Sequence, residues 1–136
     1  MSKPRVLVAR RIFPEVMARL GEHFECVAND ADTVFSPAEL SQRLAGCWGV
    51  LTTGSERIDE ALLQANPQLR AVCNMAVGYN NIDVAACRAH DVVCTNTPDV
   101  LTETTADFGF ALLLATARRI TEAEAYLRAG HWDRWS

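Results

Sequence analysis

The sequence contains no two glycines that are separated by a single residue. Its seven glycines are spread over 136 residues, at positions 21, 46, 49, 54, 78, 109 and 130. A dinucleotide-binding turn requires the pattern G-x-G-x-x-G, and a P-loop requires G-x-x-x-x-G-K, because backbone N–H groups must approach the phosphates closely. Neither pattern occurs, so these residues are expected to carry no phosphate cradle of their own.

Patterns for metal binding and for disulfides are missing too. The histidines show no H-x-x-x-H spacing and the cysteines no C-x-x-C spacing, which leads us to expect no metal site. The histidines are His23, His90 and His131, and the cysteines are Cys26, Cys47, Cys73, Cys87 and Cys94. An odd number of cysteines, mostly within apolar runs, predicts buried free thiols in a reducing cytoplasm.

Charge and hydropathy exclude two further classes of partner. The formal net charge is −4 and the 13 basic residues are scattered, so no surface is expected to follow a nucleic-acid backbone. The longest apolar segment, residues 108–115, is far shorter than the ~20 residues that cross a bilayer. Residues 6–9 are too short for the apolar core of a signal peptide. Neither nucleic acid nor membrane is expected as a partner.

Short apolar runs alternate with segments of helical periodicity, and this alternation is typical of βαβ units. Strands are expected at residues 5–9, 24–28, 48–52, 70–74 and 92–95, and helices at 14–20, 37–44, 59–65 and 82–89. This order predicts an α/β fold with a flavodoxin-like, doubly wound, five-stranded parallel sheet covered on both faces. Ligands of such sheets bind at the carboxyl ends of the strands, which points to the loops after the first, third and fourth strands.

The last third of the chain predicts one long helix, from residue 102 to residue 129, with Gly130 as the residue that ends it. Such a helix would be roughly 40 Å long, which exceeds the width of a five-stranded domain of this size. Residues 108–117 are apolar nearly all round. The helix is therefore expected to pack against something outside the sheet domain.

Two familiar users of this topology are disfavoured by the first loop. A receiver domain requires acidic residues at the ends of the first and third strands, where this sequence has Ala9-Arg10-Arg11 and Thr52-Thr53-Gly54. A flavodoxin requires a hydroxyl-rich phosphate loop after the first strand, and Ile12-Phe13-Pro14 offers none.

The expected crevice contains Thr53-Gly54-Ser55 after the third strand and Val77-Gly78 after the fourth. Glycine lets backbone N–H groups approach an anion, and Asn80 or Asn81 could cap the next helix and add its positive dipole end. One interpretation is a site for a small carboxylate built from main-chain donors. The other is that Gly54 and Gly78 only turn the chain, and spacing alone favours this second interpretation.

Residues 74–120 resemble the N-terminal portion of the D-isomer-specific 2-hydroxyacid dehydrogenases. The elements that carry the resemblance are V-G-Y-x-N-I-D at residues 77–83, V-x-x-T-N-T-P up to Pro98, D-V-L-T-E-T-T-A-D at 99–107, and A-R-R at 117–119. Within that family the chain looks most like the bacterial glyoxylate/hydroxypyruvate reductases, which also reduce 2-ketogluconate. Residues before 74 fit the same pattern more loosely.

The resemblance implies a division of the chain. Residues 1–98 would form a flavodoxin-like substrate-binding domain, which in the family is completed by a returning C-terminal helix. Residues 99–136 would form the hinge and a long dimerisation helix, 102–129, that leads into an NAD(P)-binding Rossmann domain absent from this chain. The catalytic histidine, its partner glutamate and the substrate-binding arginine of the family would also lie beyond Ser136.

The resemblance also implies roles for particular residues. Val77 and Gly78 would donate N–H groups to the substrate carboxylate, with Thr53 and Gly54 opposite. Val77 and Thr105 match positions near the nicotinamide of NADP or NAD. Asn80 departs from the aspartate that is common in the family, which we expect to alter a turn more than the chemistry.

Three functions are consistent with these residues. The first is the substrate-binding part of a homodimeric, NAD(P)H-dependent dehydrogenase that reduces small 2-keto acids. In that case the 136-residue chain alone is expected to be inactive and to bind no cofactor. The second is a stand-alone carboxylate-binding or dimerisation module without redox activity. The third is an α/β domain whose crevice is empty.

Overall fold

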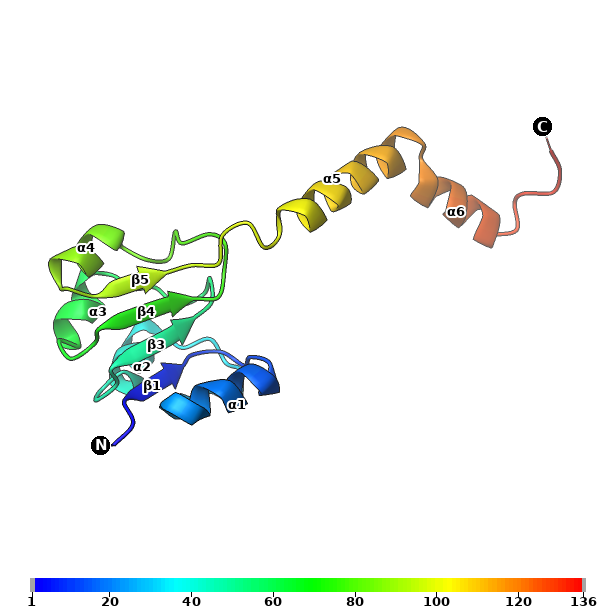
Figure 1. Cartoon of the computed structure of the whole chain (residues 1–136). Helices are drawn as coiled ribbons and strands as arrows, with labels where there is room; N and C mark the ends of the chain where they lie inside the picture. Colours follow the sequence, from blue (N-terminus) through cyan, green and yellow to red (C-terminus); the bar gives the residue numbers. More distant parts are fainter. Residues whose placement is uncertain (1, 136) are drawn as a thin grey trace. The chain divides into compact units, whose positions relative to one another are not determined.

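The structure, a computed structural model, describes residues 2–135 and contains two compact units, Met1–Pro98 and Asp99–Ser136. Strands and helices alternate strictly in the first unit (Figure 1). The strands are β1 (Arg5–Val8), β2 (Glu25–Ala28), β3 (Gly49–Thr52), β4 (Ala71–Asn74) and β5 (Val93–Thr95). The helices are α1 (Pro14–His23), α2 (Pro37–Arg43), α3 (Glu60–Ala65) and α4 (Val84–Ala89).

The sheet is parallel throughout, with the strand order β2-β1-β3-β4-β5. This is the flavodoxin-like order, and it confirms the expected fold class. Each strand lies within one residue of its expected ends. Because the order reverses between β1 and β3, the carboxyl ends of these strands flank the switch point at which such folds bind ligands.

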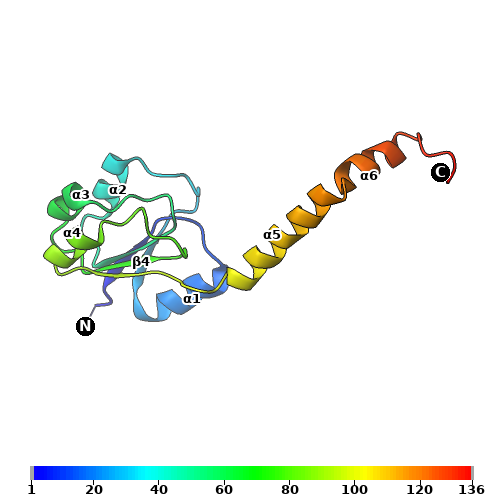
Figure 2. The ribbon, with the colours of Figure 1, turned by 90° about the horizontal axis from the view of Figure 1, so that it is seen from above.

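The main core lies between the sheet and the helices α2, α3 and α4, which occupy one face (Figure 2). Leu7, Val50 and Val72 point from three adjacent strands into it and are almost fully buried. These strand residues meet Leu44 and Leu63, which are also almost fully buried and come from the helical side. This packed layer holds the strand ends, and so the loops that follow them, in a defined position.

Local signals in the sequence fix the start of α2. Ser36 accepts a hydrogen bond from the N–H of Glu39 through its hydroxyl, while the Glu39 carboxylate accepts one from the N–H of Ser36 at 2.9 Å. Pro37 occupies the first helical turn, where a missing N–H costs nothing. The helix therefore begins where the sequence predicts it.

The other face of the sheet is only partly covered, contrary to the expectation of cover on both faces. Helix α1 lies on this side and packs near β2. Cys73 of β4 and Val93 and Thr95 of β5 remain exposed, Val93 to 64%. The reason is the strand order: only the β1-to-β2 crossover runs in the direction that places its helix on this face.

The second unit contains two helices, α5 (Thr102–Ala117) and α6 (Ile120–Arg128), instead of the single helix expected from residue 102 to residue 129. The backbone of Arg119 is left-handed, with φ 52°, and this interrupts the helical hydrogen-bond ladder. The sequence did not reveal the break, because left-handed residues are usually glycine or asparagine. No helix within residues 2–135 is long and apolar enough to cross a membrane.

Candidate functional site

Two loops at the carboxyl edge of the sheet carry four of the five candidate residues. Thr53 and Gly54 follow β3, whereas Val77 and Gly78 follow the neighbouring strand β4. The backbone joins the two segments: the N–H of Ile58 donates to the carbonyl of Asn81, and the N–H of Asp83 donates to the carbonyl of Ile58, both at 2.8 Å. The two loops therefore belong to one structural element.

The fifth candidate, Thr105, belongs to the other unit of the chain. It lies on α5, in the second unit, where it is exposed and its N–H donates to the carbonyl of Leu101 at 2.9 Å. Its expected place near a nicotinamide stays a prediction.

The buried carboxylate of Glu56 organises the first loop. Its Oε2 accepts hydrogen bonds from the backbone N–H of Thr53 at 2.8 Å and from the Thr53 hydroxyl at 3.2 Å. Glu56 is only 1% exposed, and its Oε1 has no hydrogen-bond partner within residues 2–135. Because Glu56 accepts from both the N–H and the hydroxyl of Thr53, Thr53 shapes the loop, whereas the N–H of the adjacent Gly54 makes no hydrogen bond within residues 2–135.

Neither candidate glycine is required by the turn in which it lies. Within residues 2–135 the glycines with positive φ are Gly46 and Gly130, not Gly54 or Gly78. A Cβ added at Gly54 or Gly78 would meet no atom within 4 Å. A left-handed backbone in the turn, which would have explained these two glycines, is therefore not observed. The space where a Cβ would lie is open at both positions.

Side-chain amides hold the carbonyls of the second loop. Asn96 donates to the carbonyl of Val77 and Asn74 donates to the carbonyl of Gly78, each at 2.8 Å. No hydrogen bond within residues 2–135 uses the N–H groups of Val77, Gly78 or Gly54. Three backbone donors are thus free at two adjacent loops, which is an arrangement that can bind a small carboxylate.

The expectation that Asn80 or Asn81 caps the following helix is wrong. Asp83 is the N-cap of α4, and its Oδ1 accepts a hydrogen bond from the N–H of Ala86 at 2.9 Å. The Asn81 side chain instead donates to the carbonyl of Thr53 at 3.0 Å and to that of Glu56 at 2.9 Å. With a carboxylate already at its N-terminus, the short α4 does not supply the expected positive dipole end.

Arg10 is a residue at this edge that the reasoning from sequence did not select. It follows β1, donates from Nε to Oδ1 of Asp32 at 3.0 Å, and donates from Nη1 to the hydroxyl of Ser55 at 3.0 Å. The hydrogen bond from Arg10, followed by one from the N–H of Arg11, lowers the pKa of the Asp32 carboxyl. An arginine directly after the first strand, at the switch point, was the signal that could have identified it.

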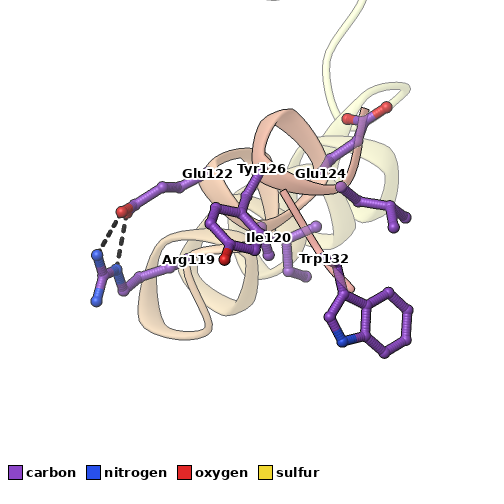
Figure 3. A pocket seen from close by; sticks show the side chains of 8 residues that line it. Arg119, Ile120, Glu122, Glu124, Tyr126 and Trp132 are labelled. Atoms are coloured by element: carbon purple, nitrogen blue, oxygen red, sulfur yellow. Dashed lines mark hydrogen bonds and ion pairs between the residues drawn. The ribbon is translucent and has the colours of Figure 1, made fainter. Parts of the chain in front are cut away.

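Neither of two surface hollows is lined by all four loop candidates. One lies beside Gly54 but includes neither Val77 nor Gly78; its other lining residues are Arg57, Ile58, Asp59, Asn80, Asn81, Ile82 and Asp83. The second lies on α6 and is lined by apolar and charged side chains, among which Arg119 and Glu122 form an ion pair (Figure 3). Ile120, Tyr126 and Leu127 in this second hollow are each at least half exposed. The hollow on α6 is therefore part of an apolar helix surface that no other described segment covers.

Among residues 2–135 we find neither a positive-φ glycine between a strand and a helix nor a cluster of metal-ligating side chains. Gly46 precedes β3 and Gly130 follows α6, so no positive-φ glycine among residues 2–135 forms the strand-to-helix turn that holds a pyrophosphate. No group of three or more histidine, cysteine or acidic side chains in this part of the chain could hold a metal ion.

The fold defines a class: a flavodoxin-like α/β domain, here with free backbone N–H groups at the carboxyl edge of its sheet. Residues 6–131 match the family model described as D-isomer specific 2-hydroxyacid dehydrogenase, catalytic domain. The match covers most of the chain, which therefore belongs to this family of oxidoreductases.

Relatives with assigned activities are similar over nearly the whole chain. The glyoxylate reductase of Korarchaeum cryptofilum is 43% identical over 130 residues, which are 96% of this chain and 39% of that protein. The glyoxylate/hydroxypyruvate reductase B of Serratia proteamaculans is 43% identical over 131 residues, which are 96% of this chain and 40% of that protein. The chain spans about two fifths of the length of these relatives.

Solved structures agree with the same assignment. The NADPH-dependent glyoxylate/hydroxypyruvate reductase of Sinorhizobium meliloti, in complex with NADP and malonate, has a TM-score of 0.76 and 39% identity. That alignment covers 96% of this chain and 40% of the other. The TT0316 protein of Thermus thermophilus has a TM-score of 0.83 and 38% identity, over 97% of this chain and 42% of the other.

Proposed function

We propose that this chain is the substrate-binding part of an NAD(P)H-dependent reductase of small 2-keto acids, with glyoxylate and hydroxypyruvate as substrates and D-2-hydroxy acids as products. The observation that carries the proposal is the pair of loops at which Gly54, Val77 and Gly78 present free N–H groups. Glycine at two of these positions satisfies no requirement of the backbone or of packing within the described residues. The named activities of the similar reductases support the same substrate class.

In this proposal the chain binds and orients the substrate. The N–H groups of Val77 and Gly78 donate to the carboxylate from one side and that of Gly54 from the other, which fixes the direction of the adjacent keto group. NADP or NAD, when bound to the intact protein, supplies the hydride that reduces the keto carbon. Val77 and Thr105 are the residues of this chain proposed to lie near the nicotinamide.

The intact protein is proposed to be a cytoplasmic homodimer. Helix α5 of the second unit exposes large apolar side chains on all sides, including Phe108, Phe110 and Leu113 at 60% or more. A second copy of the same segment would bury them. The exposed strip of Cys73, Val93 and Thr95 is the proposed seat of the returning helix that the family resemblance implies.

The decisive assay compares the purified 136-residue chain with an intact glyoxylate reductase at equal molar concentration. With NADPH and glyoxylate or hydroxypyruvate, the chain alone is expected to show no oxidation of NADPH above the buffer rate. Binding of oxalate, which resembles the substrate carboxylate, is expected to shift the amide NMR signals of Gly54 and Gly78. A turnover rate near that of the intact enzyme would contradict the proposal that this chain only binds and orients the substrate.

The second candidate is a stand-alone carboxylate-binding or dimerisation module without redox activity. It is favoured by the fact that both loops and the exposed helices lie within residues 2–135. Mass spectrometry of the protein isolated from cells separates the two candidates. A chain mass near 15.0 kDa, in a protein that is a folded dimer, supports the module, whereas a longer chain supports the reductase. If oxalate shifts no amide signal, the third possibility, an empty crevice, is correct.

A further inference from the structure

Four carbonyl groups in the two candidate loops accept hydrogen bonds from asparagine side chains. Asn81 donates to the carbonyls of Thr53 and Glu56, Asn96 to that of Val77, and Asn74 to that of Gly78, at distances between 2.8 and 3.0 Å. An asparagine side chain has two N–H donors, and Asn81 directs its amide nitrogen at two carbonyls. Both carbonyls only accept hydrogen bonds, which fixes the orientation of the Asn81 amide. A longer contact of 3.4 Å joins the same nitrogen to Oδ1 of Asn74.

Two of these carbonyls, those of Thr53 and Val77, belong to the same peptide unit as a candidate donor. A trans peptide is planar, and its C=O and N–H point in opposite directions. The carbonyl of Thr53 shares its plane with the N–H of Gly54, and the carbonyl of Val77 shares its plane with the N–H of Gly78. An asparagine that holds the carbonyl therefore turns the N–H away from itself.

The N–H of Val77 is oriented in the same manner by the backbone. The carbonyl of Ala76, in the same peptide unit, accepts a hydrogen bond from the N–H of Thr97 at 3.0 Å. Asn96 and Thr97 are neighbours directly after β5, so one short segment orients the donors of both Val77 and Gly78. Asn81 performs the corresponding task for the loop after β3.

We propose that Asn81 and Asn96 are positioning residues for the carboxylate site: Asn81 sets the direction of the Gly54 N–H, and Asn96 sets that of the Gly78 N–H. The proposal rests on the proposed carboxylate site for its functional consequence. It goes beyond that site by assigning the N–H groups of Gly54 and Gly78 each to one asparagine outside their own peptide unit.

The geometry explains why asparagine is suited to these positions. Gly54 and Gly78 have no Cβ and no neighbour within 4 Å of where it would be, so their own contacts do not hold the peptide planes. Aspartate has nearly the same shape as asparagine but only accepts hydrogen bonds when ionised. Aspartate at residue 81 or 96 would oppose a carbonyl oxygen with a carboxylate and would release the peptide plane.

The experiment compares three isosteric variants of the full chain: Asn81→Asp, Asn96→Asp and, as the matched control, Asn80→Asp. Asn80 is exposed, and its side chain makes no hydrogen bond within residues 2–135, so its variant adds the same charge one residue from Asn81. The readouts are the amide NMR signals and solvent exchange rates of Gly54 and Gly78 without ligand, and the dissociation constant of oxalate. Thermal unfolding followed by circular dichroism reports whether each variant is folded.

A crossed pattern is expected. Asn81→Asp should shift the Gly54 amide and speed its exchange while leaving Gly78 near its wild-type position, and Asn96→Asp should do the reverse. Each should weaken oxalate binding by about tenfold or more, the effect of losing one hydrogen bond to a charged group. Asn80→Asp should change the dissociation constant by less than about threefold, as is usual for an exposed charge.

The proposal is overturned if the amide signals of Gly54 and Gly78 in Asn81→Asp and Asn96→Asp are the same as in the Asn80→Asp control. It is also overturned if each of the two variants shifts both amide signals equally. If Asn81→Asp does not fold, Asn81→Ser removes the same two hydrogen bonds without adding charge, and the same crossed pattern applies to it. Failure of the wild-type chain to bind oxalate would instead refute the proposed function, because the ligand-free amide signals decide the role of the asparagines independently.

Discussion

At the scale of single residues, the five cysteines differ in their surroundings although they look alike in the sequence. Cys47 and Cys87 are buried, Cys26 and Cys94 are partly buried, and Cys73 is exposed on the uncovered face of the sheet. All five are free thiols, as expected, but the expectation of burial holds only for some of them. An apolar strand does not reveal which of its faces a helix will cover.

This difference predicts an order of thiol reactivity. Burial, with Cys94 as the next contribution, raises the pKa of the Cys87 thiol to about 11, so almost none of it is thiolate at neutral pH. We expect Cys73 to react first and Cys87 last with iodoacetamide at pH 7.5, as followed by peptide mass spectrometry. The variant Cys73→Ser should remove the fast phase, and equal labelling of Cys87 and Cys73 in the folded chain would contradict the described burial.

At the scale of elements, the agreement between sequence and structure follows the range of the interactions. The capping box of Ser36 and Glu39 and the proline that follows Ser36 act within four residues, and α2 begins as predicted. The ends of the strands were likewise predicted to within one residue, because apolar runs bounded by polar residues are a local signal. Two local features were missed. An arginine gives no sign in the sequence of a left-handed backbone at residue 119, and Asn80, Asn81 and Asp83 are all residue types that can cap a helix.

The capping box of α2 gives a quantitative prediction. Ser36→Ala removes the hydroxyl that accepts from the Glu39 N–H, and it should lower the free energy of unfolding by about 1 kcal/mol. Ser36→Thr keeps a hydroxyl at this position and should retain most of the stability. Urea unfolding followed by circular dichroism measures both variants, and equal midpoints for alanine and threonine would show that the cap contributes nothing.

At the scale of the whole molecule, exposed apolar side chains are concentrated in the second unit. None of the residues of α5 or α6 is buried. In a helix that is apolar on every face, this exposure is expected to be relieved by association, and we proposed a second copy as the partner.

This proposal predicts that the chain is a dimer and that the dimer depends on α5. Phe108 and Leu112 lie four residues apart, on the same face of the helix, and are 65% and 52% exposed. Replacing both with glutamate should convert the dimer into a monomer in size-exclusion chromatography with light scattering. A control with glutamate at the exposed polar residues Thr102 and Thr121, which lie outside the row of Phe108 and Leu112, should remain dimeric. A wild-type chain that is monomeric at all concentrations would refute the proposed interface.

The candidate site shows both the reach and the limit of the sequence. The rule that ligands bind at the carboxyl ends of strands led to the loops of Gly54 and Gly78, and the structure brings those loops together. The reasoning from sequence did not select Glu56 as the buried partner of Thr53, although the two are only three residues apart. It could not assign Asn81 its link to the other loop, since that contact joins two separate segments of the chain. Whether the four residues bind substrate stays a prediction.

The sequence by itself determined the order of strands and helices, the parallel sheet, the capping box at the start of α2, and the membership of the family. These properties depend on periodicity, turn chemistry and motif, all of which are local along the chain. Only the tertiary structure decided which face of β4 and β5 is open, which N–H groups are free, and which asparagines orient them. Those depend on hydrogen bonds and packing between distant segments, which exist only once the two loops are held side by side at the edge of the sheet.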